Sequence, residues 1–186
     1  MIKKKVLVVL GGTSGERKVS LETGKACLKA LKNMGYKTSI YDPKKKPLNL
    51  IDKNKTDIIF NALHGKDGED GIAQSYFEYL RIPYTHSGVI SSYNAMNKVI
   101  SKEIFKKKKI ISPNFFVIKK KDYTKIRLNK KHKSKKIKFP IVIKPIDEGS
   151  SIGVKICKNI SELNKNTKSL LKKHSELIFE PYIGGQ

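Results

Sequence analysis

The chain has 186 residues, of which 38% are hydrophobic, and its 40 Lys and Arg against 16 Asp and Glu give a formal net charge of +24. The hydrophobic content excludes a disordered polyelectrolyte and suits one generous domain or two small ones. No apolar run approaches the length that spans a bilayer, so the sequence predicts a globular protein without a membrane-spanning helix.

The positive charge is carried almost entirely by lysine, because arginine occurs only at positions 17, 81 and 127. Such a charge attracts nucleic acid non-specifically. Specific nucleic-acid readers, however, use arginine forks and stacked aromatic rings, whereas these lysines are scattered. We interpret them as solvated surface and expect neither a specific nucleic-acid partner nor a membrane. A basic nucleic-acid-binding protein remains the alternative from a different class, and a salt titration of binding would distinguish the two.

The location of the protein is expected to be the cytoplasm. The start Met1-Ile2-Lys3-Lys4-Lys5 is similar to that of a signal peptide, but the apolar stretch behind it ends at Gly11-Gly12 without a small-residue cleavage site. Cys27 and Cys157 show neither metal-ligand nor redox spacing, so both are expected to be small core residues in a reducing compartment.

The first half of the chain alternates strands and helices, which predicts a parallel sheet with helices packed on it. A strand is expected over residues 5–10, because the continuous apolar run at 6–10 is typical of a strand that is buried on both faces. The further elements expected here are a helix from Ser20 that stops at Gly35, strands over 38–41 and 57–63, and a helix over 72–80.

The second half is expected to continue the pattern. The elements expected here are a helix over 97–108, strands over 114–118, 141–144, 154–157 and 177–180, and a helix that Ser161 caps and that runs to about Lys173. The lysine-rich segment 119–138 is expected to be mobile and solvated. The fold class that we predict is therefore α/β, in two units.

Two polar motifs of the first half follow buried strands. Gly11-Gly12-Thr13-Ser14-Gly15-Glu16 lies between the first strand and the first helix, where ligands bind in open α/β sheets. Its spacing differs from that of a dinucleotide-binding loop, and a plain glycine turn explains it equally well. His64-Gly65 follows the third strand similarly, although a lone histidine is more often a structural donor than a catalyst.

The most informative motif of the second half joins Lys144 to Glu148-Gly149-Ser150-Ser151-Ile152-Gly153. A lysine on a strand beside a loop of glycines and serines supplies a cation, backbone N–H groups and hydroxyl donors, which nucleotide phosphates require. An ordinary hairpin with a serine-rich turn is the structural alternative, and the spacing is not that of a P-loop.

Taken together, the motifs resemble the D-alanine–D-alanine ligases of the ATP-grasp superfamily. The matching stretches occur in family order at residues 10–20, 62–71, 82–89, 96–98, 143–145 and 148–153. The resemblance covers nearly the whole chain, and only the lysine-rich segment has no counterpart. It implies a small open parallel-sheet domain over residues 1–96, a central ATP-grasp subdomain over 97–179 and the start of a further ATP-grasp domain at 180–186.

The resemblance implies an ATP-dependent reaction for peptidoglycan precursor synthesis. ATP phosphorylates the carboxylate of one D-alanine, and the amine of a second D-alanine attacks the acyl phosphate. By match to the family, Glu16 binds the ammonium of the first D-alanine, Ser150 hydrogen-bonds Glu16, and His64 lies beside them. Another ATP-grasp ligase with a different carboxylate substrate is the closest alternative, and D-lactate or D-serine as second substrate stays open.

The resemblance also implies an ATP site. The expected ATP-binding residues are Lys98, Lys144, Ser151, Glu180, Pro181 and Ile183. The lysines would contact the phosphates, the serine and its loop amides would cover them, and the glutamate would accept from the adenine amino group. The proline lacks an N–H, so it would offer adenine only its carbonyl.

The end of the chain departs from the family pattern. In the family, an arginine that stabilises the transferred phosphoryl group, the metal ligands and a tyrosine-bearing lid lie beyond the position of Gln186. We therefore expect a truncated fragment that is inactive alone, with the ligands of Mg²⁺ (or Mn²⁺) in the missing part. The resemblance also allows a homodimer.

Overall fold

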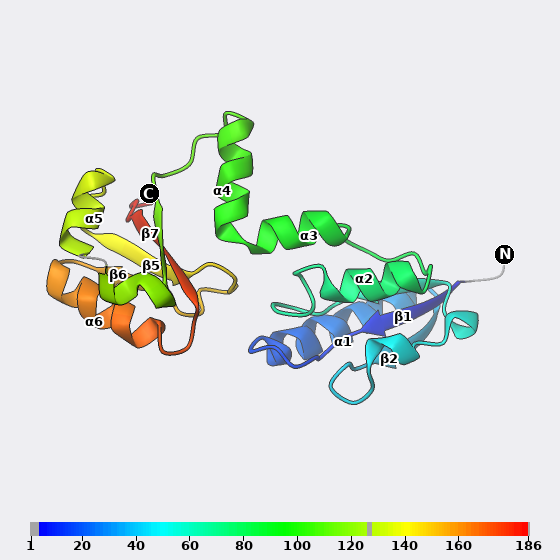
Figure 1. Ribbon diagram of the computed structural model, residues 1–186. Helices are drawn as coiled ribbons and strands as arrows, with labels where there is room; N and C mark the ends of the chain where they lie inside the picture. The colour runs from blue at the N-terminus through cyan, green and yellow to red at the C-terminus, as the bar shows by residue number, and fades with distance from the viewer. Residues whose placement is uncertain (1–3, 126–127, 186) are drawn as a thin grey trace. The chain divides into compact units, whose positions relative to one another are not determined.

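The computed structural model describes residues 4–125 and 128–185 and divides into two compact units, Met1–Ala95 and Met96–Gln186 (Figure 1). The functional assignment of the expected domains stays a prediction. The boundary expected at residue 180 falls within a strand that runs from Glu176 to Pro181.

Unit 1 is built on the open parallel sheet that the sequence predicts. Its strands are β1 (Lys5–Val9), β2 (Lys37–Tyr41) and β3 (Ile58–Asn61), in the order β2-β1-β3. The helices of unit 1 are α1 (Arg17–Asn33), α2 (Ile72–Tyr79) and α3 (Val89–Met96), with short 3-10 turns η1 (Leu48–Leu50) and η2 (Lys53–Lys55). Since β1 lies between two strands and is covered on both faces, its apolar run is continuous rather than alternating.

The core of unit 1 has two sides because successive side chains of β1 point to opposite faces of the sheet. Leu7 and Val9 pack with Ile59 and Phe77 on one face, while Val8 packs beneath the leucines of α1 on the other. The parallel strands all end at the same edge, so the loops that follow β1, β2 and β3 gather there.

Unit 2 corrects the expectation that its sheet would be parallel. Its strands are β4 (Phe116–Lys119), β5 (Ile141–Pro145), β6 (Lys155–Cys157) and β7 (Glu176–Pro181), in the order β4-β7-β5-β6. All three pairings are antiparallel. The loop between β5 and β6 is too short for a parallel crossover, and β7 returns between β4 and β5.

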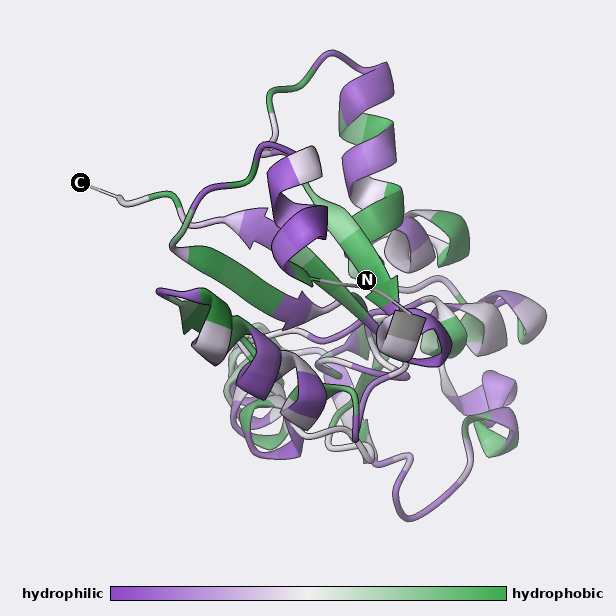
Figure 2. Ribbon diagram, turned by 60° about the vertical axis from the view of Figure 1, so that its left-hand side comes forward, coloured by the Kyte–Doolittle hydropathy of each residue, from purple (hydrophilic) through white to green (hydrophobic). Residues whose placement is uncertain are grey.

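One face of this sheet is buried. The helical elements of unit 2 are α4 (Lys98–Lys107), η3 (Lys120–Lys125), α5 (Leu128–Ser134) and α6 (Ile160–Leu170). Leu163 of α6 packs with Ile141 and Ile143 of β5, and the rings of Phe116 and Phe179 stack with centroids 4.6 Å apart. Figure 2 shows the resulting pattern, with hydrophobic stretches along the strands and mixed colours on the helices.

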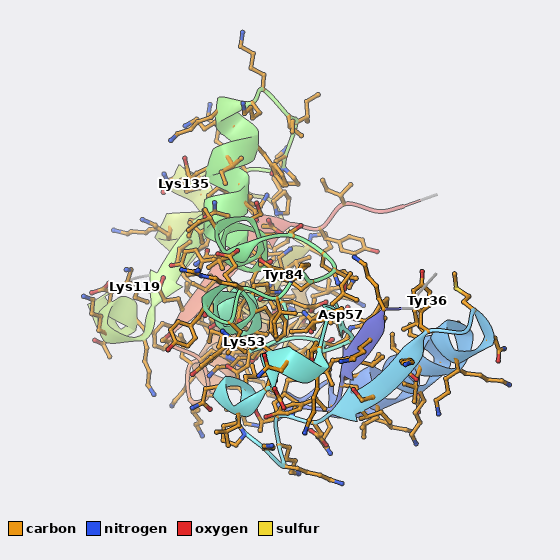
Figure 3. The ribbon with its side chains drawn as sticks, turned by 90° about the vertical axis from the view of Figure 1, so that its right-hand side faces the viewer. Tyr36, Lys53, Asp57, Tyr84, Lys119 and Lys135 are labelled. Atoms are coloured by element: carbon orange, nitrogen blue, oxygen red, sulfur yellow. The ribbon has the colours of Figure 1, made fainter. Side chains whose placement is uncertain are left out.

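Most described side chains of the lysine-rich segment are exposed, as expected, but the segment also contains helical elements and buried positions that the sequence did not predict. Its described residues form η3 and α5, while residues 126–127 lie outside the described part. Leu128, His132 and Ile137 are buried. Nδ1 of His132 lies 2.9 Å from the carbonyl oxygen of Ile137. The lysines between these buried positions extend outward, as Lys135 does in Figure 3. The high lysine content therefore concealed a helix with a narrow apolar side.

Two smaller expectations are corrected. Helix α6 begins after Asn159, whose side chain accepts a hydrogen bond from the Glu162 N–H at 2.9 Å, so Asn159 rather than Ser161 is the N-cap. Cys157 is buried as predicted, but Cys27 on α1 is only half-buried. Among the described residues, no helix is long and apolar enough to cross a membrane.

Candidate functional site

The glycine turn after β1 is held from both sides. Gly11 and Gly12 have φ values of +84° and +71°, which glycine adopts without steric cost. The Gly11 N–H donates to the Ser20 hydroxyl at 2.8 Å, and that hydroxyl donates to the Ala62 carbonyl at 2.6 Å. Through these two hydrogen bonds the fully buried Ser20 joins the turn to the end of β3.

An ion pair fastens the same turn to the end of β2. Arg17 binds both oxygens of Asp42, with Nη1–Oδ1 3.0 Å and Nη2–Oδ2 2.7 Å, and also donates to the Gly12 carbonyl at 2.7 Å. The Gly12 and Lys44 N–H groups donate to Asp42 Oδ1 at 3.0 Å each. The hydrogen bond from Arg17 is the main cause that lowers the pKa of Asp42 to about 2, while Asp42 raises the pKa of Arg17.

Glu16 lies at the N-cap of α1 without capping it through its side chain. The residue is 7% exposed, and within unit 1 the described residues give its carboxylate no hydrogen bond or ion pair. A Cβ added to Gly65 would lie 2.4 Å from Glu16 Oε2, so only glycine leaves room for the carboxylate there. A carboxylate that is buried without a partner is unfavourable, and a cationic group would compensate it.

The loop after β3 lies against the glycine turn. The Ser14 hydroxyl donates to the His64 carbonyl at 2.7 Å, which joins the two expected motifs directly. His64 Nδ1 lies 3.8 Å from Glu69 Oε1, and the Gly65 N–H donates to Glu69 Oε2 at 2.7 Å. A cavity of about 330 Å³ is lined by Gly11–Ser14 and His64 among others. The structure thus brings Glu16, His64 and Gly65 together in what we call the unit 1 site.

The register of the antiparallel sheet in unit 2 places two expected residues on one face. Val142 pairs with Glu180, and Lys144 pairs with Ile178. Directly paired residues point to the same face, as do residues two apart along a strand. Lys144 and Glu180 therefore lie on the face opposite the core, although they belong to different strands.

The two side chains form an ion pair. Lys144 Nζ lies 2.6 Å from Glu180 Oε2, and the second oxygen, Oε1, lies 2.7 Å from Nζ of Lys102 on α4. Burial alone would raise the pKa of Glu180, but the hydrogen bonds and charges of both lysines outweigh it, so the pKa is lowered. Glu180 is thus an ionised, 7% exposed carboxylate between two cations.

Lys98 lies at the start of the same helix. Its N–H donates to the Ile146 carbonyl at 2.9 Å, and its ammonium donates to the Glu148 carbonyl. Burial is the main cause that lowers the pKa of Lys98, and the nearby charge of Lys144 lowers it further. Lys98, Lys102, Lys144 and Glu180 with the loop 146–153 form what we call the unit 2 site.

The loop of the unit 2 site carries backbone strain. Ser150 and Ser151 have φ values of +44° and +61°, which L-residues other than Asn and Asp seldom adopt. Gly153, at +74°, packs so closely on Pro145 that a Cβ would lie 2.8 Å from its Cγ. Such strain concentrates at binding sites, and the phosphate-covering role expected for the loop stays a prediction. The hydrogen bond expected between Ser150 and Glu16 would join the two units and stays a prediction.

The strand β7 leads into the last expected ATP-binding residues. Tyr182 donates its N–H to the Pro140 carbonyl at 2.8 Å, while Ile183 is 66% exposed. Sequence reasoning missed Arg17, Asp42 and Lys102. Lys102 had a signal, because it lies four residues after Lys98 and so on the same face of the helix.

The described residues do not provide a metal site. Among them, no group of three or more His, Cys, Asp or Glu side chains is placed to hold a metal ion. The Mg²⁺ (or Mn²⁺) that the sequence resemblance implies therefore has no fitting ligand set in residues 4–125 and 128–185.

An open parallel unit followed by an antiparallel unit with lysines gathered around a strained loop defines an α/β protein of the ATP-grasp class. Family models described as D-ala D-ala ligase N-terminus and D-ala D-ala ligase C-terminus match residues 41–87 and 104–186, together more than half of the chain. The chain belongs to the D-alanine–D-alanine ligase family.

Individual relatives match nearly the whole chain. The D-alanine–D-alanine ligase of Pelagibacter ubique is 48% identical over 184 residues, which are 98% of this chain and 59% of that ligase. A crystal structure of the ligase from Bacillus anthracis superposes with a TM-score of 0.84 at 36% identity and covers 98% of this chain and 58% of its own. The structure of that ligase complexed with ATP has a TM-score of 0.83 at 34% identity. The chain thus spans about three fifths of these relatives.

Proposed function

We propose that the chain forms the part of an ATP-dependent D-alanine–D-alanine ligase that binds the first D-alanine and the nucleotide, for peptidoglycan precursor synthesis. The observation that carries the proposal is the unit 2 site, where Lys98 and Lys144 lie close enough to repel each other's charge beside a strained serine loop. Two neighbouring cations favour a polyanion such as a triphosphate.

The unit 1 site supports D-alanine as the other substrate. The buried Glu16 carboxylate has no partner within the described part of unit 1, and an amino acid brings an ammonium that would pair with it. The joining of Ser14 to His64 and the ion pair between Arg17 and Asp42 hold the loops around Glu16 in place. Positioning of this kind supplies much of the rate when two substrates must meet.

The reaction that we propose has two steps. A carboxylate oxygen of the first D-alanine attacks the γ-phosphorus of ATP, the bond to the β,γ-bridging oxygen breaks, and ADP leaves. The amine of the second D-alanine then attacks the carbonyl carbon of the acyl phosphate, loses a proton and expels phosphate, which carries away one carboxylate oxygen. Lys98 and Lys144 would hold the phosphates during the first step, and Ser151 with the loop amides would cover them.

The adenine end of the nucleotide is proposed to lie at the end of β7. Glu180 would accept from the 6-amino group, with the backbone at Pro181 and Ile183 beside the ring. The described residues supply no ligand cluster for the proposed Mg²⁺ (or Mn²⁺), so the proposal assigns them no step that involves the metal.

A substrate survey tests the proposal. We define the chimaeric ligase as this chain followed by the segment of the Pelagibacter ubique relative that continues beyond its match to this chain. We expect ATP-dependent phosphate release with D-alanine and little with L-alanine, while D-serine and D-lactate, offered with D-alanine, report on the second substrate. Activity with another carboxylate but not with D-alanine would contradict the substrate assignment. Salt-sensitive binding to nucleic acid without any ATP dependence would favour the different-class alternative.

A further inference from the structure

Lys102 has no role in the reaction proposed above, yet its ammonium makes two hydrogen bonds and an ion pair within unit 2. Its Nζ donates to the Ser112 hydroxyl at 2.7 Å and to the Pro113 carbonyl at 3.0 Å, and it lies 2.7 Å from Glu180 Oε1. These contacts use all three ammonium donors. The same nitrogen lies 5.3 Å from the centre of the Phe115 ring, and the side chain is only 9% exposed. Lys102 is therefore fixed in place.

Lys144 binds the other oxygen of the same carboxylate but is less restrained. Its side chain is 25% exposed, against 9% for Lys102 and for Glu180. The only contact with the described residues that the Lys144 ammonium makes at hydrogen-bonding distance is the one with Glu180 Oε2. Glu180 thus has one fixed counter-ion and one accessible counter-ion.

The difference matters when a nucleotide binds. If Lys144 turned toward a phosphate, a Glu180 with no other cation would become an unpaired buried carboxylate, which is strongly unfavourable. Lys102 prevents this because it keeps Glu180 paired through Oε1. The carboxylate would stay ionised and oriented, while Oε2 became available to a new donor.

We propose that Lys102 is a positioning residue that holds Glu180 as the acceptor for the nucleotide base and so releases Lys144 to the phosphates. The inference rests on the proposed function and deepens it. The 6-amino group of adenine donates to such an acceptor, whereas guanine carries a carbonyl oxygen there and would be repelled. Lys102 therefore determines the choice of base without touching the nucleotide.

The test compares ATP with GTP in the chimaeric ligase. For Lys102→Met, which keeps the apolar stem and removes the charge, we expect the KM for ATP to rise about tenfold and the preference for ATP over GTP in kcat/KM to fall by at least about tenfold. The KM for D-alanine should stay unchanged, because Lys102 acts within unit 2. A general loss of stability would lower activity with both nucleotides equally and leave their ratio intact.

Three further variants complete the test. Lys102→Arg keeps the charge and should retain most of the preference for ATP. Lys106→Met removes an exposed lysine one turn along α4 and should leave every constant unchanged. If Lys102→Met does not fold, Lys102→Gln replaces it, since an amide can still donate to Ser112 and Pro113 without a charge.

The outcomes separate this inference from the proposed function. An unchanged preference for ATP over GTP and an unchanged KM for ATP in the uncharged variants would overturn the role of Lys102 while the ligase activity stands. If the unmodified chimaeric ligase showed no dependence on ATP, the proposed function would fail and the inference with it.

Discussion

Asp42→Asn tests whether the ion pair at the end of β2 holds the loop that presents Glu16. Asn keeps the shape of the side chain, and its Oδ1 can still accept from Gly12, Lys44 and Arg17 Nη1, which all donate to Asp42 Oδ1. At the other position, however, an NH₂ group replaces Oδ2, which lies 2.7 Å from Arg17 Nη2. The substitution therefore removes the charge and sets two donors against each other.

The expected cost follows from the pKa of Asp42. A shift from 3.8 to about 2 corresponds to about 2 kcal/mol of stability at neutral pH. Solvent at the 26% exposed Arg17 side chain screens part of this stabilisation, which leaves about 1 kcal/mol. The conflict between the two donors in the variant adds to the cost of the substitution. We expect Asp42→Asn to lower the free energy of unfolding of the chain by about 1–2 kcal/mol at pH 7.

The lowered pKa of Asp42 also determines how this stability difference changes with pH. Because the pKa of Asp42 is lower in the folded state, its contribution is fully present above the unfolded value of 3.8 and is lost as the pH falls toward about 2. The difference in stability between the unmodified chain and the variant should therefore be largest near neutral pH and shrink between about pH 4 and pH 2.

Urea unfolding followed by circular dichroism at several pH values measures this difference. Asp52→Asn is the matched control, since Asp52 caps η2 and pairs with the exposed Lys55 at 3.5 Å; its loss should cost less than about 0.5 kcal/mol. An Asp42→Asn variant as stable as the unmodified chain at pH 7 would refute the reasoning. So would a difference that stayed constant down to pH 2.

Three further predictions concern the chimaeric ligase. Lys144→Ala should weaken the use of ATP by about 1.5–3 kcal/mol through loss of a charge-assisted hydrogen bond, and unchanged KM and kcat with varied ATP would make it a structural lysine. Glu16→Gln should impair kcat/KM for D-alanine by about 2–4 kcal/mol and leave the KM for ATP unchanged; a small loss of stability alone would leave only a helix-dipole role. Gly65→Ala should also impair the use of D-alanine, because its Cβ would lie 2.4 Å from Glu16 Oε2 at a φ of +69°. Wild-type D-alanine kinetics in that variant would show that Glu16 need not lie where the structure has it.

Local patterns were sufficient to predict most elements of the fold. From Val6 onward β1 is apolar without a break because this part of the strand is buried on both faces, and the glycines after it have the positive φ values that such a turn requires. Helix α3 was missed because its apolar residues are interrupted by Ser91, Ser92 and Asn94, so it has little amphipathic pattern.

The sequence predictions were wrong where an element depends on contacts between residues that lie far apart in the chain. The antiparallel sheet of unit 2 depends on β7 inserting between β4 and β5, a long-range pairing that no local pattern reports. Helix α5 was hidden because its buried positions are few among many lysines, and one of them is His132.

Some residues of the candidate site also had a signature in the sequence, whereas others had none. Lys144 and its loop were predictable because a cation beside a glycine- and serine-rich turn has a sequence signature. Asp42 had none, since it acts through an arginine 25 positions away in the chain. The shared use of Glu180 by Lys102 and Lys144 required the register of β5 and β7 and the placement of α4.

The most direct test of the proposed reaction follows an oxygen atom. The chimaeric ligase is supplied with ATP and with D-alanine whose carboxylate is labelled with ¹⁸O, and both the dipeptide and the released phosphate are examined by mass spectrometry. We predict D-alanyl-D-alanine together with one ¹⁸O in each phosphate released, because the acyl phosphate passes one carboxylate oxygen to the leaving group. Dipeptide with unlabelled phosphate would contradict the acyl-phosphate step, and ATP hydrolysis without dipeptide would contradict the ligase activity itself.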